Sequence, residues 1–163
     1  MKNTITQILL VVFLIIFGQQ AFSQNNILTD YELEIKKGKQ ETRDGHSTLA
    51  VIVTLTNNST DTLKYFSMSC SWQEFYSVST EKLKIQQALC GKNVPVIIEI
   101  PPKQSETVTL DLILDPLSDA PEINLRIGFN LMKASASQNR FDYDYEKQKL
   151  KGNIIWSNRI IMK

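Results

Sequence analysis

The amino-acid sequence predicts an all-β protein, an antiparallel sandwich of two sheets and about eight strands. Apolar residues recur at every second position in several short runs, which is typical of strands with one buried face. Clusters of Asn, Ser, Asp, Gly and Pro separate these runs at even spacing, and no segment between them repeats with a helical period. Strands joined by such short turns pair antiparallel, because parallel pairs need long crossovers.

Residues 1–23 are predicted to be a signal peptide. Lys2 supplies a positive charge, and Ile8–Phe17 is an apolar run that is too short for a membrane span, which needs about 20 residues. Ala21–Ser23 places small residues where a signal peptidase cleaves, so cleavage is expected after Ser23. The alternative is an uncleaved N-terminal anchor.

The mature chain, residues 24–163, is long enough for a single domain with a two-layer core. The full sequence has 18 Lys+Arg and 17 Asp+Glu. Removing Lys2 with the signal peptide leaves 17 of each sign, so the mature net charge is zero. A neutral surface gives no electrostatic basis for binding nucleic acid or an anionic membrane. We therefore expect no nucleic-acid partner, and no membrane span once the signal peptide is removed.

The stretch Leu49–Cys70 predicts an antiparallel hairpin around which the other strands pack. Its sequence, LAVIVTLTNNSTDTLKYFSMSC, contains two alternating runs joined by a polar turn. The two strands are expected at Leu49–Thr56 and Thr62–Cys70. Before them, Tyr31–Lys36 is expected to be a strand and Lys37–Ser47 a turn, since it contains the common turn pair Asp-Gly.

The remaining strands follow the hairpin down the chain. Trp72–Val78 interrupts the alternation and is expected to form one helical turn that covers the end of the sandwich with aromatic rings. The later strands are expected at Lys82–Gln87, Val94–Ile100, Thr107–Leu114, Ile123–Leu131 and Ile154–Met162. The core is expected to contain Val51, Val53, Leu55, Phe66, Met68, Ile98, Leu110, Leu112, Ile127 and Phe129.

The two cysteines, Cys70 and Cys90, are predicted to form a disulfide, because an even count in an exported protein favours a bridge. A bridge across a loop of this length stabilises by about 3 kcal/mol in the chain-entropy model. The alternative is two buried thiols that pack as small apolar side chains. No CxxC motif is present, so neither a redox motif nor a zinc site is supported.

Four segments of the chain carry a resemblance to a known group of proteins: LAVIVTLTNNSTDTLKYFSMSCSW, VPVIIEIPPKQSETVTLDLIL, INLRIGFNLMK and IIWSNRIIMK. Their layout resembles that of small immunoglobulin-like sandwich proteins that Bacteroidota export. In such proteins a strand ending in N-x-S/T-x-D-T is followed by a proline-then-strand pair, an R-I-G-F strand and a final W-S-N strand. The resemblance spans Ile35–Ile161. It implies an immunoglobulin-like fold and a location in the periplasm or outside the cell, but no particular chemistry.

The sequence contains no constellation of catalytic residues. His46 is the only histidine, and we interpret it as a solvated residue of the predicted turn rather than a catalytic base or metal ligand. The run DYDYE, with Asp142, Asp144 and Glu146, spaces oxygens as calcium loops do, but it lacks their glycine and distal glutamate. The protein is therefore expected not to be an enzyme and to need neither a metal nor another cofactor.

The long polar segment Ala134–Lys151 carries the candidate binding residues Phe141, Tyr143 and Tyr145. Exposed aromatic side chains on a long loop offer a large contact area at low entropic cost. Two alternatives stay open: the three rings cover the core from an edge hairpin, or the loop is disordered. Separately, Thr62 in Asp-Thr-Leu resembles the sites at which Bacteroidota attach O-glycans, which makes it a candidate glycosylation site.

These features predict a non-catalytic, exported protein-interaction or envelope-associated module, whose partner is another envelope or secreted protein. The alternative is a secreted protease inhibitor built on a sandwich, acting through loops at one end. The loops in question are Gly91–Asn93, Asp115–Pro121 and Ala134–Lys151. Their convergence at one end would favour inhibition, whereas a free edge strand would favour interaction by strand addition.

Overall fold

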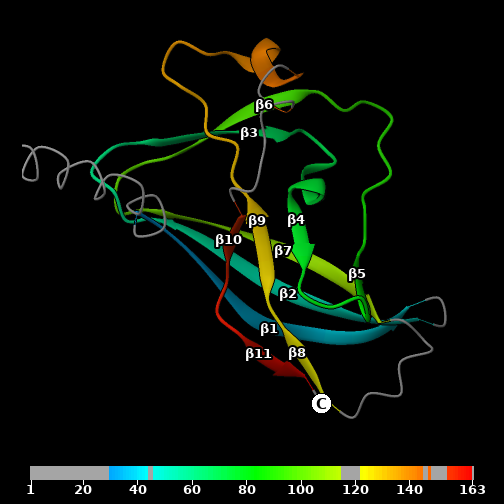
Figure 1. Cartoon of the computed structure of the whole chain (residues 1–163). Helices are drawn as coiled ribbons and strands as arrows, with labels where there is room; N and C mark the ends of the chain where they lie inside the picture. The colour runs from blue at the N-terminus through cyan, green and yellow to red at the C-terminus, as the bar shows by residue number, and fades with distance from the viewer. Residues whose placement is uncertain (1–29, 44–45, 115–121, 145–146, 148–153, 163) are drawn as a thin grey trace, which may run out of the picture. The chain divides into compact units, whose positions relative to one another are not determined.

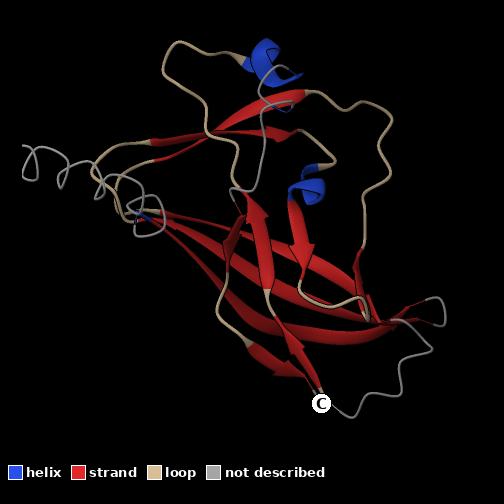
Figure 2. Ribbon diagram, viewed as in Figure 1, coloured by secondary structure: helices blue, strands red, loops and turns tan. Residues whose placement is uncertain are grey.

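The computed structural model describes residues 30–43, 46–114, 122–144, 147 and 154–162, and Figure 1 traces the chain. These residues form eleven strands, and helical structure is confined to short turns (Figure 2). The prediction of an all-β, antiparallel sandwich is confirmed. The predicted signal peptide, residues 1–23, lies outside the described residues.

One layer of the sandwich is a four-stranded antiparallel sheet with the order β1-β2-β7-β5. Its strands are β1 (Tyr31–Arg43), β2 (His46–Asn57), β5 (Leu83–Ile85) and β7 (Ser105–Leu114). In β2 and β7, the apolar side chains at every second position point inward and are buried or half-buried, because each strand has one face on the core.

The second layer consists of three small antiparallel sheets with the orders β10-β9-β4, β11-β8 and β3-β6. Its strands are β3 (Leu63–Met68), β4 (Tyr76–Val78), β6 (Pro95–Ile100), β8 (Ile123–Leu125), β9 (Ile127–Asn130), β10 (Ile154–Trp156) and β11 (Ile160–Met162). The chain beyond β9 continues alongside β3, where the Phe66 amide donates to the Met132 carbonyl at 2.8 Å. One continuous stretch of chain therefore connects all three sheets.

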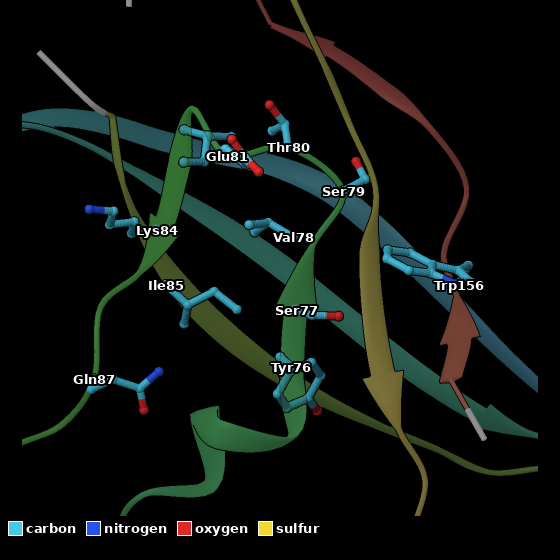
Figure 3. A pocket seen from close by; sticks show the side chains of 11 residues that line it. Tyr76, Ser77, Val78, Ser79, Thr80, Glu81, Lys84, Ile85, Gln87 and Trp156 are labelled. Atoms are coloured by element: carbon cyan, nitrogen blue, oxygen red, sulfur yellow. The ribbon is translucent and has the colours of Figure 1, made fainter. Parts of the chain in front are cut away.

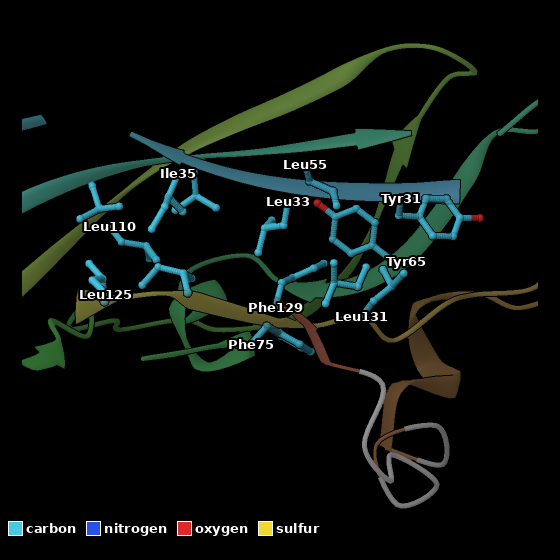
Figure 4. Close-up of a cluster of buried hydrophobic side chains, with 14 of the residues drawn as sticks. Tyr31, Leu33, Ile35, Leu55, Tyr65, Phe75, Leu110, Leu125, Phe129 and Leu131 are labelled. Carbon is cyan, nitrogen blue, oxygen red and sulfur yellow. The ribbon is translucent and has the colours of Figure 1, made fainter. Parts of the chain in front are cut away.

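The core lies between the two layers. Figure 4 shows Leu33, Ile35 and Leu110 of the first layer facing Leu125 and Phe129 of the second. Eight of the ten predicted core residues are buried. The other two, Met68 and Ile98, are half-buried and pack against the core from its margin.

The predicted hairpin at Leu49–Cys70 is wrong, because β2 and β3 lie in different layers. β2 pairs with β1 and β7, whereas β3 pairs with β6. The side chain of Asn57, at the end of β2, is fully buried, and its amide nitrogen donates to the carbonyl of Asp61 at 2.8 Å. It also donates to the carbonyls of Ile100 (2.9 Å) and Pro101 (3.2 Å), at the end of β6. One side chain therefore fixes the crossing from β2 to β3 and the crossing from β6 to β7.

The turn predicted at Lys37–Ser47 is also wrong, because most of this segment is strand. β1 and β2 stay paired through it, with one bulge at Gly38 and Lys39. A Cβ atom on Gly38 would lie 2.9 Å from the carbonyl oxygen of Ala50, so the bulge requires glycine. The described side chains of this part of β1 are mostly exposed, which removes the alternation that marks a half-buried strand. The predicted turn pair Asp44-Gly45 lies outside the described residues.

Two predicted strands are each broken in two. Ile123–Leu131 is interrupted at Arg126, and Ile154–Met162 is interrupted after β10. At the break, the hydroxyl of Ser157 accepts a hydrogen bond from the Ile127 amide at 3.0 Å, so a side-chain oxygen takes the place of a main-chain carbonyl in the ladder. These two breaks, together with the short β4, account for the difference between about eight expected strands and eleven.

Asn57→Ala should lower the free energy of unfolding by about 3 kcal/mol, because it removes a fully buried carboxamide whose hydrogen bonds link both crossings, the one to the buried Ile100 carbonyl included. Urea unfolding followed by circular dichroism measures this loss. The matched control is Asn58→Ala. The Asn58 amide reaches only Glu32, at 3.5 Å on the surface, so its removal should cost less than about 0.5 kcal/mol. Equal losses in the two variants would contradict the role given to Asn57.

Candidate functional site

The sandwich has one covered side and one open side. On the covered side, β1 is the edge strand of its sheet, and Asn158 bonds to it with both side-chain atoms. The Asn158 oxygen accepts from the Ile35 amide at 2.7 Å, and its nitrogen donates to the Ile35 carbonyl at 3.2 Å. Unpaired groups of an edge strand invite pairing with another chain, so this contact protects β1. The open side is the one on which β7 and β5 face β4 and β6.

On the open side, β7 is only partly covered. β5 pairs with the last three residues of β7, and the next amide, that of Gln86, donates to the Asp111 carbonyl at 2.8 Å. No described strand pairs with Ser105–Leu110 on this side. Main-chain groups point to the same edge at every second residue of a strand. The direction of the Asp111 carbonyl therefore places the main-chain groups of Thr107 and Thr109 on the free edge.

A hollow of about 220 Å³ lies between the layers beside this free edge. β3 and β6 line one wall, β7 lines the other, and β4 and β9 form the back. Its lining includes the side chains of Tyr65, Trp72, Tyr76, Glu106, Val108 and Phe129. The hollow thus combines four aromatic rings with one carboxylate.

The aromatic rings form a continuous surface. The centroid of the Phe129 ring lies 5.5 Å from that of Tyr65 and 4.8 Å from that of Tyr76. The Trp72 ring lies edge-on to Tyr76 at 5.9 Å. Trp72 belongs to the 3-10 helix η2 (Trp72–Phe75), the helical turn that the sequence predicted. That turn buries Phe75 in the core and places Trp72 in the wall of the hollow, whereas the prediction was that the rings cover the end of the sandwich.

Glu106 is half-buried and occupies an inward position of β7, two residues before Val108 and four before Leu110. Burial raises the pKa of the Tyr65 hydroxyl well above its usual value, and the nearby carboxylate of Glu106 raises it further, partly through a hydrogen bond. Burial also raises the pKa of Tyr76, again with a contribution from Glu106. The hollow therefore holds two protonated tyrosines close to one carboxylate.

A wider and shallower groove of about 730 Å³ adjoins the hollow and shares Tyr76 with it. Figure 3 shows this groove along β4, the turn after β4, and β5, with Trp156 at its border. The Trp156 side chain is partly exposed and carries the Arg126 guanidinium 5.5 Å from its ring centroid. Ser77 and Ser79 contribute hydroxyls. The groove extends the open side.

The segment 86–94 connects β5 to β6 and closes one end of the open side. The predicted disulfide is confirmed: it joins Cys90 of this segment to Cys70 after β3, with their Cα atoms 6.1 Å apart. The Asn93 side-chain oxygen accepts from the amides of Cys70 and Ser71, both at 3.2 Å. The other side chains of the segment are exposed, and that of Leu89 is fully exposed.

The three predicted binding residues of Ala134–Lys151 do not act together. Tyr143 is buried, with its ring 6.3 Å from those of Phe66 and Phe75, and its hydroxyl donates to Glu74 at 3.2 Å. Phe141 is 80% exposed. Tyr145 lies outside the described residues. The segment is helical at this point rather than extended, so side chains two residues apart point in different directions.

Tyr143→Ala should lower the free energy of unfolding by about 3 kcal/mol, because it removes a buried ring. Phe141→Ala should change that free energy by less than about 0.5 kcal/mol, because its ring lies in solvent. Thermal or urea unfolding of the two variants distinguishes a residue that anchors the segment from one that is free to contact a partner. A loss of the same size in both would contradict the difference in their burial.

The other candidate residues lie at separate places in the chain. Thr62 is exposed in the turn between β2 and β3, and its glycosylation stays a prediction. His46 is the first residue of β2, and its side chain is outside the described part of the structure. The Asp142 carboxylate accepts from the Asn139 amide at 2.7 Å and so caps a 3-10 turn. Within the described part of the chain, no three His, Cys, Asp or Glu residues are placed to hold a metal ion.

The loops of the inhibitor hypothesis are not all described, because Asp115–Pro121 lies outside the described residues. Figure 1 shows β8, which follows this loop, at the lower end of the molecule, whereas the orange turn η3 (Arg140–Asp142) lies at the upper end. The described positions therefore do not favour action through converging loops. The unpaired edge of β7 is the stronger candidate for a binding surface.

Sequence reasoning missed Glu106, although a signal was present. The alternation that placed Val108, Leu110 and Leu112 inward also places Glu106 inward when it is extended by two residues. A charged residue at an inward position of a strand departs from the apolar pattern. Such departures are typical of functional positions and of edge strands.

The strands and the open side define an all-β sandwich with one uncovered edge. No protein-family model matches the chain, and no curated protein matches it. Among solved structures, the chain is similar to a FixG-related protein from Vibrio parahaemolyticus, with 12% sequence identity and a TM-score of 0.40. The similarity covers 82% of this chain and 97% of that one. No helix in the described part of this chain is long and apolar enough to cross a membrane.

The free energy of unfolding should fall as the pH rises above about 10, the ordinary pKa of tyrosine. Above that pH the unfolded chain ionises tyrosines that the fold keeps protonated, Tyr65 and Tyr76 among them, so the unfolded state binds fewer protons. Below it, this contribution to stability is fully present. Tyr65→Phe should make the fall shallower in urea unfolding measured at several pH values. An identical slope in the variant would contradict the burial of the Tyr65 hydroxyl.

Proposed function

We propose that this protein is an exported, non-catalytic interaction module that binds an extended segment of a partner protein by adding it as a strand to β7. The observation that carries the proposal is the unpaired main chain of Ser105–Leu110 on the open side. An extended peptide gains main-chain hydrogen bonds at such an edge, and its alternate side chains provide specificity. The partner is another envelope or secreted protein.

The free part of β7 supports this role because it lacks several of the devices that protect edge strands. Proteins protect their edges with proline, lysine, bulges or coverage by another element. β1 has such protection, from the bulge at Gly38 and from Asn158. The outward side chains of the free part of β7 are Ser105, Thr107 and Thr109, which are short and, for threonine, well suited to strands.

We also propose a periplasmic or secreted location. The Cys70–Cys90 disulfide supports it, because disulfides persist in oxidising compartments. The signal peptide expected over residues 1–23 and the resemblance to exported immunoglobulin-like proteins of Bacteroidota point the same way. Phe141 is proposed as a secondary contact for a partner, since its exposed ring is backed by the Arg140 guanidinium at 4.9 Å.

The test is the affinity of the disulfide-bonded protein for peptides selected from a displayed random library, with Thr109→Pro as the variant. Proline removes the amide that faces the free edge, and edge strands tolerate it. Binding should weaken by about tenfold or more, because a main-chain hydrogen bond is lost and the added strand is displaced.

The matched control is Thr109→Val, which keeps the amide and should bind as the natural protein does. Circular dichroism and thermal unfolding confirm that both variants fold. Unchanged affinity in Thr109→Pro, or a library that yields no peptide for the natural protein, would contradict strand addition at β7.

A further inference from the structure

We infer that the hollow beside the β7 edge is a receptor for one basic side chain, a lysine or an arginine, carried by the segment that pairs with β7. The inference deepens the proposed function and rests on it for the direction from which the side chain enters. Strand addition alone leaves the chemistry of the bound segment open. The hollow specifies that chemistry.

The walls of the hollow suit a cation. The rings of Tyr65, Trp72, Tyr76 and Phe129 surround it, with neighbouring centroids between 4.8 and 5.9 Å apart. The face of an aromatic ring attracts a cation through its quadrupole, most strongly where water is excluded. The same rings pack against the methylene groups that precede the charged end of a lysine or arginine.

Glu106 supplies the complementary charge. No Lys, Arg or His among the described residues forms an ion pair with it. By contrast, Glu99 on the exposed face of β6 is paired with Lys64 at 2.6 Å. Glu106 instead interacts with the Tyr65 hydroxyl inside the hollow. A half-buried carboxylate that faces aromatic rings has lost part of its hydration without gaining a counter-ion. A basic side chain in the hollow would supply that counter-ion.

The size and position of the hollow fit a single side chain. Its volume of about 220 Å³ is below the ~300–1,000 Å³ typical of sites for small-molecule ligands and cofactors. Glu106 and Val108 line it, while the intervening Thr107 presents its main chain to the adjacent free edge. In a strand added to that edge, every second side chain points to the inner face of the sheet and so toward the hollow.

Glu106 also has a simpler interpretation. An inward-pointing charge near the end of an edge strand can prevent unwanted pairing, because pairing would bury it. On that interpretation the hollow binds no cation, and Glu106 hinders a partner strand instead of selecting one. The two interpretations predict opposite effects of neutralising Glu106, so they are separable by experiment.

The experiment is an NMR titration of the isotope-labelled, disulfide-bonded protein with Nα-acetyl-lysine N-methylamide. We expect saturable shifts at the Trp72 indole and at the Glu106 amide, with a dissociation constant in the millimolar range. The Nε-acetylated form of the same probe carries no charge and should leave these signals in place. Glu106→Gln keeps the shape of the side chain and removes its charge, and should weaken binding of the lysine probe by about tenfold or more.

Glu99→Gln is the matched control, because it removes the same charge from the exposed face and should leave the affinity unchanged. The inference is overturned if the lysine probe causes no saturable shifts at the hollow, if the two variants bind it equally, or if the acetylated probe binds as well. If the probe fails while selected peptides still lose affinity in Thr109→Pro, the proposed function stands without this inference. If the probe binds while Thr109→Pro has no effect on peptides, strand addition fails and the cation site stands.

Discussion

The buried carboxamide of Asn57 is the constraint on which the architecture depends. Through hydrogen bonds to the carbonyls of Asp61, Ile100 and Pro101, it joins two of the places where the chain crosses between layers, from β2 to β3 and from β6 to β7. The main chain reinforces this junction, since the Asn57 amide donates to Gln104 at 2.9 Å. Both crossings are thereby held at one end of the sandwich. From there β3 and β6 leave on a path that diverges from β7 (Figure 1), and the hollow lies between them.

The two sides of the sandwich differ as a consequence. On the covered side, Asn158 bonds to β1 and brings β10 and β11 against it. On the open side, the short β5 covers only the end of β7, and the departing β6 leaves the rest uncovered. The separation of β6 from β7 therefore has two effects. It leaves the edge of β7 uncovered, and it opens the hollow that the aromatic rings and Glu106 line.

Much of the fold is predictable because burial at period 2 is a local property of a strand. That property placed Val51, Leu110 and Phe129 in the core, and it placed most strands within a few residues of their observed bounds, with the end of β1 as the exception. It does not determine which strands pair. β3 pairs with β6 rather than β2 because Asn57 bonds to a carbonyl 43 residues away, a contact that no local pattern contains.

The candidate site was harder to predict for related reasons. The inward position of Glu106 follows from the alternation, but the absence of a paired cation in the described structure follows only from the arrangement of other strands. Phe141 and Tyr143 share a period-2 pattern that implies one common face in an extended chain. In the observed helical turn they separate, one toward solvent and one toward the core.

Hydrogen exchange of the β7 amides in the free protein tests the central claim most directly. If the edge over Ser105–Leu110 is unpaired, the amides of Thr107 and Thr109 exchange rapidly, while those of Val108 and Leu110, which face β2, are protected. Slow exchange at all four positions would show that this edge is already covered, and it would contradict the account of the open side.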